Sequence, residues 1–199
     1  MKKLPKIVIE HLEPTLSAWL LFEYENASKI FKKKVWFTNV KNKSIQKKLK
    51  KLGTIRQQSV LKIFPHEKLV ILDPRAKKTL MPDDLKGAIV VIGGILGEHP
   101  ARGRTKILLT SKAQKAKTRN LGREQSTIDG AAYIVKAIME GKKISSIPTK
   151  RGLILRVKLK PSGVYEVELP YVYPLVNGSP LISKKLSRYL TGTQSPKII

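Results

Sequence analysis

The sequence predicts an α/β fold in which helices cover both faces of a parallel sheet, followed by an antiparallel β-hairpin. Strand-like and helical segments alternate from residue 6 to residue 140, which is the pattern of successive βαβ units. Several strand-like segments are continuous apolar runs, as expected of strands buried on both faces of a parallel sheet. The last quarter of the chain changes to alternation about a turn, which is typical of a hairpin.

The strands of the expected parallel sheet are short and rich in Ile, Val and Leu, with a weaker one at the end of the series. Their ranges are 6–11, 35–40, 69–72, 88–92 and 116–119.

Four helical segments follow strands of this series. The first is expected to open at Pro14, a residue suited to a first turn, and residues 16–22 are apolar nearly all round, which indicates deep burial. In the second, residues 44–52, the apolar positions fit one helical stripe, and Gly53 is suited to a C-terminal cap. The other two are expected at residues 104–112 and 127–140.

The C-terminal part carries a different pattern. Residues 153–159 and 164–169 alternate at period two around a Pro-Ser-Gly turn and are expected to pair as the hairpin. Asn177-Gly178 marks another turn, and residues 183–190 a short final helix.

Length and composition indicate one domain with a small appendage. We expect residues 1–147 to hold the parallel fold and residues 148–199 the hairpin and final helix packed on it. Of the 199 residues, 41% are hydrophobic, so the chain can build a core, and the lack of cysteine excludes disulfides, thiolate nucleophiles and cysteine-ligated zinc. No apolar stretch approaches the roughly 20 residues of a membrane span or the apolar region of a signal peptide, so a soluble cytoplasmic protein is expected.

The charge is strongly positive. Forty Lys and Arg against 14 Asp and Glu give a formal charge of +26. Such a field attracts polyanions, and clusters at residues 32–34 and 41–51 make contact with RNA plausible. Aromatic residues are only 6%, so this contact would be mainly to phosphates. The alternative is a surface of solvated lysines.

Ligands of open parallel sheets bind beyond the carboxyl ends of the strands. The most informative strand end is the glycine-rich segment 93–97, because glycines permit close backbone approach and positive φ. The spacing is neither that of a P-loop nor that of a dinucleotide fingerprint, and the chain has no Gly-x-Ser-x-Gly elbow. Composition alone leaves open a tight strand-to-helix turn without a ligand.

Several segments together resemble the SPOUT-class protein-arginine methyltransferases, a family that acts on a small-subunit ribosomal protein. The segments are residues 9–13, 72–76, 93–105, 119–127 and 168–173. The chain departs from the family pattern at Glu98, where aspartate is common, and at residues 194–199, which lack the acidic tail of eukaryotic relatives.

The resemblance implies S-adenosylmethionine as the cofactor, bound among three loops of a deep C-terminal trefoil knot. Carried onto this sequence, the residues that would hold the cofactor are Leu72, Asp73, Pro74, Gly93, Gly94, Ile95, Leu96, Gly97, Leu121, Gly122, Gln125 and Thr127. Many SPOUT enzymes dimerise through the knot, whereas the arginine-modifying branch is monomeric, so both states stay open.

An arginine acceptor needs carboxylates that orient its guanidinium. Glu98, Glu13 and Asp129 are the candidates, although each could instead stabilise a helix N-terminus. Arg104, together with Arg102, could bind substrate phosphate or the cofactor's carboxylate, or could be solvated. The leading hypothesis is therefore a methyltransferase that acts on the translation machinery, with an arginine of a ribosomal protein as acceptor. The alternative is a SPOUT methyltransferase that modifies rRNA or tRNA, and a non-enzymatic RNA-binding protein is a third possibility.

Overall fold

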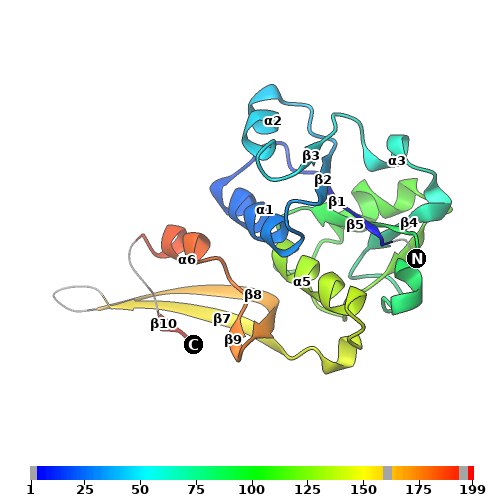
Figure 1. Cartoon of the computed structure of the whole chain (residues 1–199). Coiled ribbons are helices and arrows are strands. Elements are labelled where there is room, and N and C mark those ends of the chain that lie inside the picture. Colours follow the sequence, from blue (N-terminus) through cyan, green and yellow to red (C-terminus); the bar gives the residue numbers. More distant parts are fainter. Residues whose placement is uncertain (1–3, 159–162, 193–196) are drawn as a thin grey trace.

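The computed structural model describes residues 4–158, 163–192 and 197–199, which form a body and an arm (Figure 1). The body is a sheet of order β3-β2-β1-β5-β4-β6 in which every strand pair is parallel. Its strands are β1 (Lys6–His11), β2 (Val35–Thr38), β3 (Thr54–Ile55), β4 (Leu69–Leu72), β5 (Ile89–Gly94) and β6 (Lys117–Arg119). The predicted parallel α/β fold is therefore confirmed.

The helices include the predicted ones with shifted bounds, and one short helix, α3, that was not anticipated. They are α1 (Ala18–Ile30), α2 (Lys43–Leu49), α3 (Val60–Ile63), α4 (Arg104–Leu108), α5 (Ile128–Met139) and α6 (Lys184–Thr191). Single 3-10 turns are η1 (His66–Lys68), η2 (Pro82–Leu85), η3 (Thr110–Lys112) and η4 (Ile144–Ser146). Among the described residues, no helix has the length and apolar character that crossing a bilayer requires.

The first helix begins at Ala18 and not at Pro14. The hydroxyl of Ser17 accepts a hydrogen bond from the Leu20 N–H at 3.2 Å, which caps the helix there. Pro14 instead lies in the irregular segment that leads from β1 to α1.

Each face of the body sheet carries its own apolar core. Val90 and Ile92 of β5 belong to the core under α1, α2 and α5, whereas Ile89 and Val91 belong to the core under α3 and the segment after α4. Alternate residues of a strand point to opposite faces, so a strand covered on both sides must be apolar throughout. This burial explains the continuous apolar runs of the sequence.

The arm is an antiparallel sheet of order β10-β7-β8-β9. Its strands are β7 (Thr149–Lys158), β8 (Val164–Val176), β9 (Ser179–Pro180) and β10 (Lys197–Ile198). β7 and β8 pair over more residues than predicted, and the turn expected between them lies in part outside the described residues. The second predicted turn is present, with positive φ at both Asn177 and Gly178.

The arm contacts the body through α6 and at the base of the β7–β8 hairpin. Tyr189 of α6 packs edge-on against Phe22 of α1, with ring centroids 5.9 Å apart, and Lys185 pairs with Glu25 at 2.7 Å. At the base of β8, the Val172 N–H donates to the carbonyl of Gln125 at 2.9 Å. Since Gln125 closely precedes α5, the arm lies against one of the loops at the carboxyl edge of the sheet.

Candidate active site

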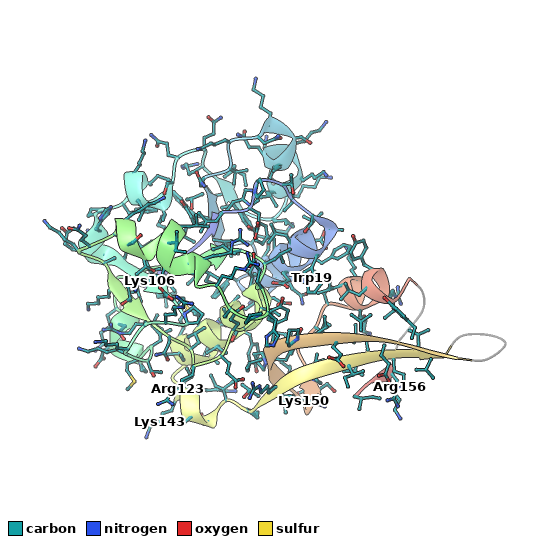
Figure 2. The ribbon with its side chains drawn as sticks, turned by 180° about the vertical axis from the view of Figure 1, so that it is seen from behind. Trp19, Lys106, Arg123, Lys143, Lys150 and Arg156 are labelled. Atoms are coloured by element: carbon teal, nitrogen blue, oxygen red, sulfur yellow. The ribbon has the colours of Figure 1, made fainter. Side chains whose placement is uncertain are left out.

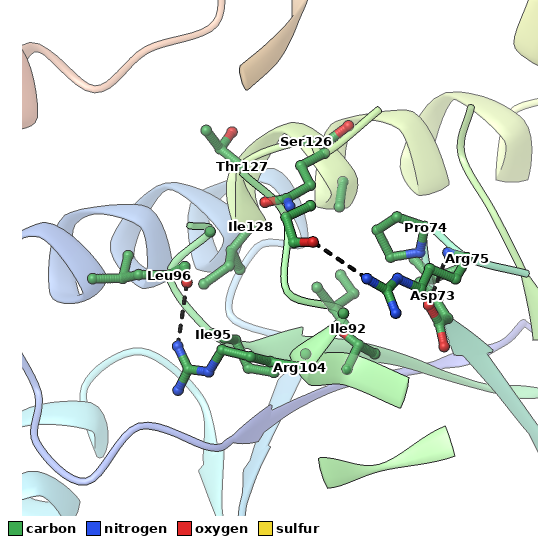
Figure 3. Close-up of a pocket in the computed structure, with 18 of the residues that line it drawn as sticks. Asp73, Pro74, Arg75, Ile92, Ile95, Leu96, Arg104, Ser126, Thr127 and Ile128 are labelled. Atoms are coloured by element: carbon green, nitrogen blue, oxygen red, sulfur yellow. Dashed lines mark hydrogen bonds between the residues drawn. The ribbon is translucent and has the colours of Figure 1, made fainter. Parts of the chain in front are cut away.

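Three loops at the carboxyl edge of the body sheet enclose a cavity of about 890 Å³, its open mouth included (Figure 3). One loop follows β4 (residues 72–75), the second connects β5 to α4 (92–105), and the third leads into α5 (121–128). Parallel strands end at the same edge of a sheet, which brings these distant segments together. They are the three loops that the resemblance assigned to the cofactor.

Ten of the twelve residues predicted to hold the cofactor line this cavity. They are Leu72, Asp73, Pro74, Gly93, Ile95, Leu96, Gly97, Leu121, Gln125 and Thr127. Gly122 lies outside the cavity in a turn, with a φ of 116°. Gly94 also lies outside it and faces the interior of the body. A Cβ there would meet the Tyr24 hydroxyl at 2.1 Å and the Glu10 carbonyl oxygen at 2.8 Å. Gly94 is therefore required for packing inside the body and not for contact with a ligand.

Gly97 has no room for a side chain. Its ideal Cβ would lie 2.5 Å from the ring of Tyr171 and 2.5 Å from Oε1 of Gln125. The Tyr171 hydroxyl donates to the Gly97 carbonyl at 2.7 Å, so the arm presses on the second cavity loop. Sequence analysis placed residues 168–173 in the family pattern but gave Tyr171 no role.

The first loop is fixed by the buried side chain of Asp73. Its Oδ1 accepts the Arg75 N–H at 2.9 Å, and its Oδ2 accepts the Thr110 hydroxyl at 2.8 Å. The exposed Arg75 side chain then reaches across the cavity to donate to the Ala101 carbonyl at 3.2 Å (Figure 3). Arg75 is a cavity residue that sequence analysis did not single out.

Arg104 and Glu13 bind each other. Two hydrogen bonds, 2.8 and 3.0 Å long, join the guanidinium to the two carboxylate oxygens. Oε1 of Glu13 also accepts the Leu96 N–H at 2.9 Å, and the hydrogen bonds that the guanidinium donates to Glu13 raise the pKa of Arg104. Glu13 therefore holds the second cavity loop, and its part in orienting an acceptor stays a prediction. Arg104 lines the cavity, but its guanidinium is occupied.

Glu98 lies where a substrate could reach it. Its side chain is 38% exposed, lines the cavity, and pairs with Arg102 at 3.0 Å and with Arg104 at 3.6 Å. The Arg102 side chain is 78% exposed, so this pair is on the surface and is weak.

Asp129 is buried behind the cavity wall and does not line it. It accepts hydrogen bonds from Asn26 Nδ2 at 2.9 Å, from the Thr127 hydroxyl at 2.7 Å and from the Gly130 N–H at 3.0 Å. The Thr127 hydroxyl in turn accepts the Gly130 N–H and caps α5. Asp129 is thus held by three neighbours at this helix start.

A second buried carboxyl, Glu23, lies beside Asp129 and was missed. Its Oε1 accepts the Trp19 indole N–H at 2.6 Å and its Oε2 accepts the Ile128 N–H at 2.8 Å. Burial, and next the charge of Asp129, raise the pKa of Glu23 to about 8, while burial also raises the pKa of Asp129. The signal for Glu23 was an acid that directly follows the apolar run of residues 16–22.

Similarity of fold defines the class of protein. Dual specific Trm10 from Thermococcus kodakaraensis superposes on 70% of this chain and 95% of its own length with a TM-score of 0.57, and its 16% identity shows the fold alone. Yeast arginine methyltransferase SFM1 complexed with SAM superposes on 96% of this chain and 91% of its own with a TM-score of 0.80 at 26% identity. The fold is similar to that of the SPOUT methyltransferases, and the chain is an S-adenosylmethionine-dependent methyltransferase.

Similarity of sequence then gives the family. Residues 6–195 match the family described as SFM1-like, Protein arginine N-methyltransferase SFM1-like. Protein arginine N-methyltransferase SFM1 of Saccharomyces cerevisiae is 31% identical over 153 residues, which are 69% of this chain and 72% of the yeast protein. The chain belongs to the SFM1-like protein arginine N-methyltransferases. The predicted enzyme class and cofactor are thereby confirmed.

Proposed function

We propose that the cavity binds S-adenosylmethionine and that the enzyme transfers its methyl group to an arginine of a ribosomal protein in the cytoplasm. The observation that carries the proposal is the convergence of the three loops, with ten predicted cofactor residues, on one cavity in a chain of this family. S-adenosylmethionine supplies a methyl group on a positively charged sulfur. The fold likeness to Trm10 supports the further proposal that these loops belong to a deep trefoil knot.

The residues of the cavity fit such a ligand. Its lining includes polar side chains of all three loops, and Gly93 and Gly97 let a planar or sugar group approach the backbone closely. Arg75 is a cavity cation whose described side-chain hydrogen bond goes to a carbonyl and not to a carboxylate. We assign Arg75 to the carboxylate of the ligand, in place of Arg104, which Glu13 occupies.

Rigidity at the second loop is the main contribution of the chain to transfer. Methyl transfer depends on in-line positioning and on electrostatics. The Glu13–Arg104 pair fixes Leu96 from one side, and Tyr171 fixes Gly97 from the other. Glu98 at the mouth adds a negative charge that attracts a cationic acceptor.

One observation favours the alternative RNA methyltransferase. Residues 26–66 contain twelve Lys or Arg and no Asp or Glu, and α2 with the turn after it, at the tip of the body, carries five of them at positions 43, 47, 48, 50 and 51 (Figure 1). We propose that this basic lobe, defined as residues 26–66, contacts the RNA of a ribonucleoprotein particle while a protein arginine receives the methyl group. Contact with RNA and methylation of RNA are separable.

The test is transfer of a tritiated methyl group into purified ribosomal subunits, followed by separation of protein and RNA. Label that is recovered as methylarginine after acid hydrolysis of the protein fraction is the expected result. Label confined to RNA would show that the acceptor is RNA and not a protein arginine. A cavity variant such as Gly97→Val is the control for contaminating methyltransferases.

A further inference from the structure

A cluster of four side chains lies behind the cavity wall, where α1 meets the arm. Trp19 and Glu23 are one turn apart on α1, and Tyr171 and Tyr173 come from the base of β8. Figure 2 shows Trp19 at this junction. The cluster contacts the cavity at two backbone groups, since Glu23 holds the N–H of Ile128 and Tyr171 holds the carbonyl of Gly97.

The cluster has acceptors but no cation. Glu23 is 3% exposed and Asp129 beside it is 2% exposed, and neither forms an ion pair within the described part of the chain. The hydroxyl of Tyr173, which is 1% exposed, has no hydrogen-bond partner among the described residues. It faces the same two carboxyls, whose charges, after burial itself, raise its pKa. Two buried carboxyls and an unpaired hydroxyl leave hydrogen-bonding capacity that a cationic donor would satisfy.

Two half-buried aromatic rings that are in contact with each other lie beside these acceptors. Trp19 and Tyr171 stand edge to face, with centroids 6.4 Å apart and an interplanar angle of 89°. Aromatic faces bind cations, and arginine more than lysine. A guanidinium also presents N–H donors in a planar fork that matches a carboxylate. The indole N–H of Trp19 occupies one oxygen of Glu23 in the position that such a donor would take.

We propose that this cluster is the acceptor site: the rings of Trp19 and Tyr171 part to admit the arginine side chain, and its guanidinium is held by Glu23 with the Tyr173 hydroxyl as a further partner. This inference rests on the proposed function and adds the residues that select arginine. It differs from the sequence-based expectation, which gave this role to Glu98, Glu13 or Asp129.

Glu23 then has a part in the chemistry. When the guanidinium binds, the neutral carboxyl releases its proton to solvent and becomes a carboxylate. One guanidinium nitrogen forms a bond to the methyl carbon while the carbon–sulfur bond breaks and its electron pair stays on sulfur. The proton lost from that nitrogen passes to Glu23, so the products are a methylated guanidinium and a neutral thioether.

The first test needs no activity. The carboxyl of Glu23 is titrated by carbon NMR in submolar guanidinium chloride and in sodium chloride of equal concentration. Titratable groups that face it are Asp129 on α5, Tyr24 on α1, and Tyr171 and Tyr173 on β8. We expect its apparent pKa to be lower in guanidinium by about one unit or more, since a bound cation favours the charged form. An identical pKa in both salts would overturn the proposal.

The second test compares two substitutions on one helix. Glu23→Gln is expected to lower kcat/KM for the arginine substrate by about 10- to 100-fold, the loss of a hydrogen-bonded charge, with unchanged affinity for S-adenosylhomocysteine. Glu25→Gln, two residues away and paired with Lys185, is the matched control and should retain activity. Methylarginine formed by Glu23→Gln at the wild-type rate overturns this inference and leaves the proposed function standing. Label found only in RNA overturns the proposed function itself, and the guanidinium titration still decides whether the cluster binds that cation.

Discussion

Arg104, at the start of α4, donates two parallel hydrogen bonds to the carboxylate of Glu13, which follows β1. The pair is partly buried, with 27% and 14% of the side chains exposed, and the same carboxylate holds the N–H of Leu96. A bidentate pair fixes geometry as well as adding energy. The shape of the second cavity loop therefore depends on a residue of the first strand end.

Arg104→Lys is expected to weaken binding of S-adenosylmethionine by roughly tenfold, since an ammonium keeps the charge but loses the fork and about 1–2 kcal/mol of hydrogen bonding. Calorimetric titration measures the effect. Arg102→Lys, at the exposed neighbouring pair, is the control and should bind normally. Equal affinity in Arg104→Lys and wild type would show that the loop keeps its shape without the fork.

Two glycines of the same segment should fail in different ways. Gly97→Ala places a methyl group against Tyr171 and Gln125 at the cavity and is expected to abolish cofactor binding while the melting temperature changes little. Gly94→Ala places a methyl group against Tyr24 and Glu10 in the core and should cost about 1–3 kcal/mol of stability, as overpacked cores do. Thermal melts with and without S-adenosylhomocysteine separate the two, and a reversed pattern contradicts the assignment.

The strands of the body could be predicted from the sequence because they are buried on both faces, and such strands must be apolar throughout. The same pattern could not show β3, which is two residues long and defined only by its pairing with β2. Helix bounds depended on single capping side chains such as Ser17, which periodicity does not detect.

The candidate site divides in the same way. Cavity residues such as Gly97 belong to a continuous glycine-rich segment, so they could be predicted from the sequence. The carboxylates could not be assigned from position, because Glu13 and Glu98 both follow strands and only the fold shows that Arg104 occupies Glu13. The burial of Glu23 could be recognised only in the folded structure, in which α5 and the arm cover α1.

Stability should depend on pH through the buried carboxyls. The folded-state pKa of Glu23 is about 8 against a reference of 4.5, so between these values the folded protein holds a proton that the unfolded chain has lost. Stability from this group is full below about pH 4.5 and falls as pH rises towards 8, by at most about 1.4 kcal/mol per unit. The raised pKa of Asp129 acts in the same direction.

Denaturant unfolding of wild type and Glu23→Gln across this pH range measures the difference. The variant, which cannot titrate at this position, should show the shallower fall, while Glu25→Gln should follow wild type. Parallel curves for wild type and Glu23→Gln would mean that Glu23 is already ionised in the folded protein.

The basic lobe should contribute salt-dependent affinity for ribosomes. Neutralising Lys47, Lys48, Lys50 and Lys51 with glutamine should flatten the slope of log affinity against log salt by up to about three to four units, because fewer counterions are released. Cofactor binding should not change. The matched control is a fourfold neutralisation of exposed lysines outside the lobe, at positions 106, 112, 142 and 143. If the slope of log affinity against log salt decreases equally in both variants, the positive charge acts through the whole surface and not through this lobe.

The last prediction separates two carboxylates that could both serve an arginine acceptor. Glu98 lies at the cavity mouth, exposed and paired with Arg102, whereas Glu23 is buried in the proposed acceptor site. A charge at the mouth attracts a cationic substrate but is screened by solvent, so Glu98→Gln should raise KM a few-fold and leave kcat nearly unchanged. A group that holds the guanidinium during transfer should, when replaced, lower kcat itself, and Glu23→Gln is expected to do so. Steady-state kinetics of both variants on one arginine substrate decide between the roles. A collapse of kcat in Glu98→Gln, with a normal kcat in Glu23→Gln, would move the acceptor site from the cluster behind Gly97 to the cavity mouth.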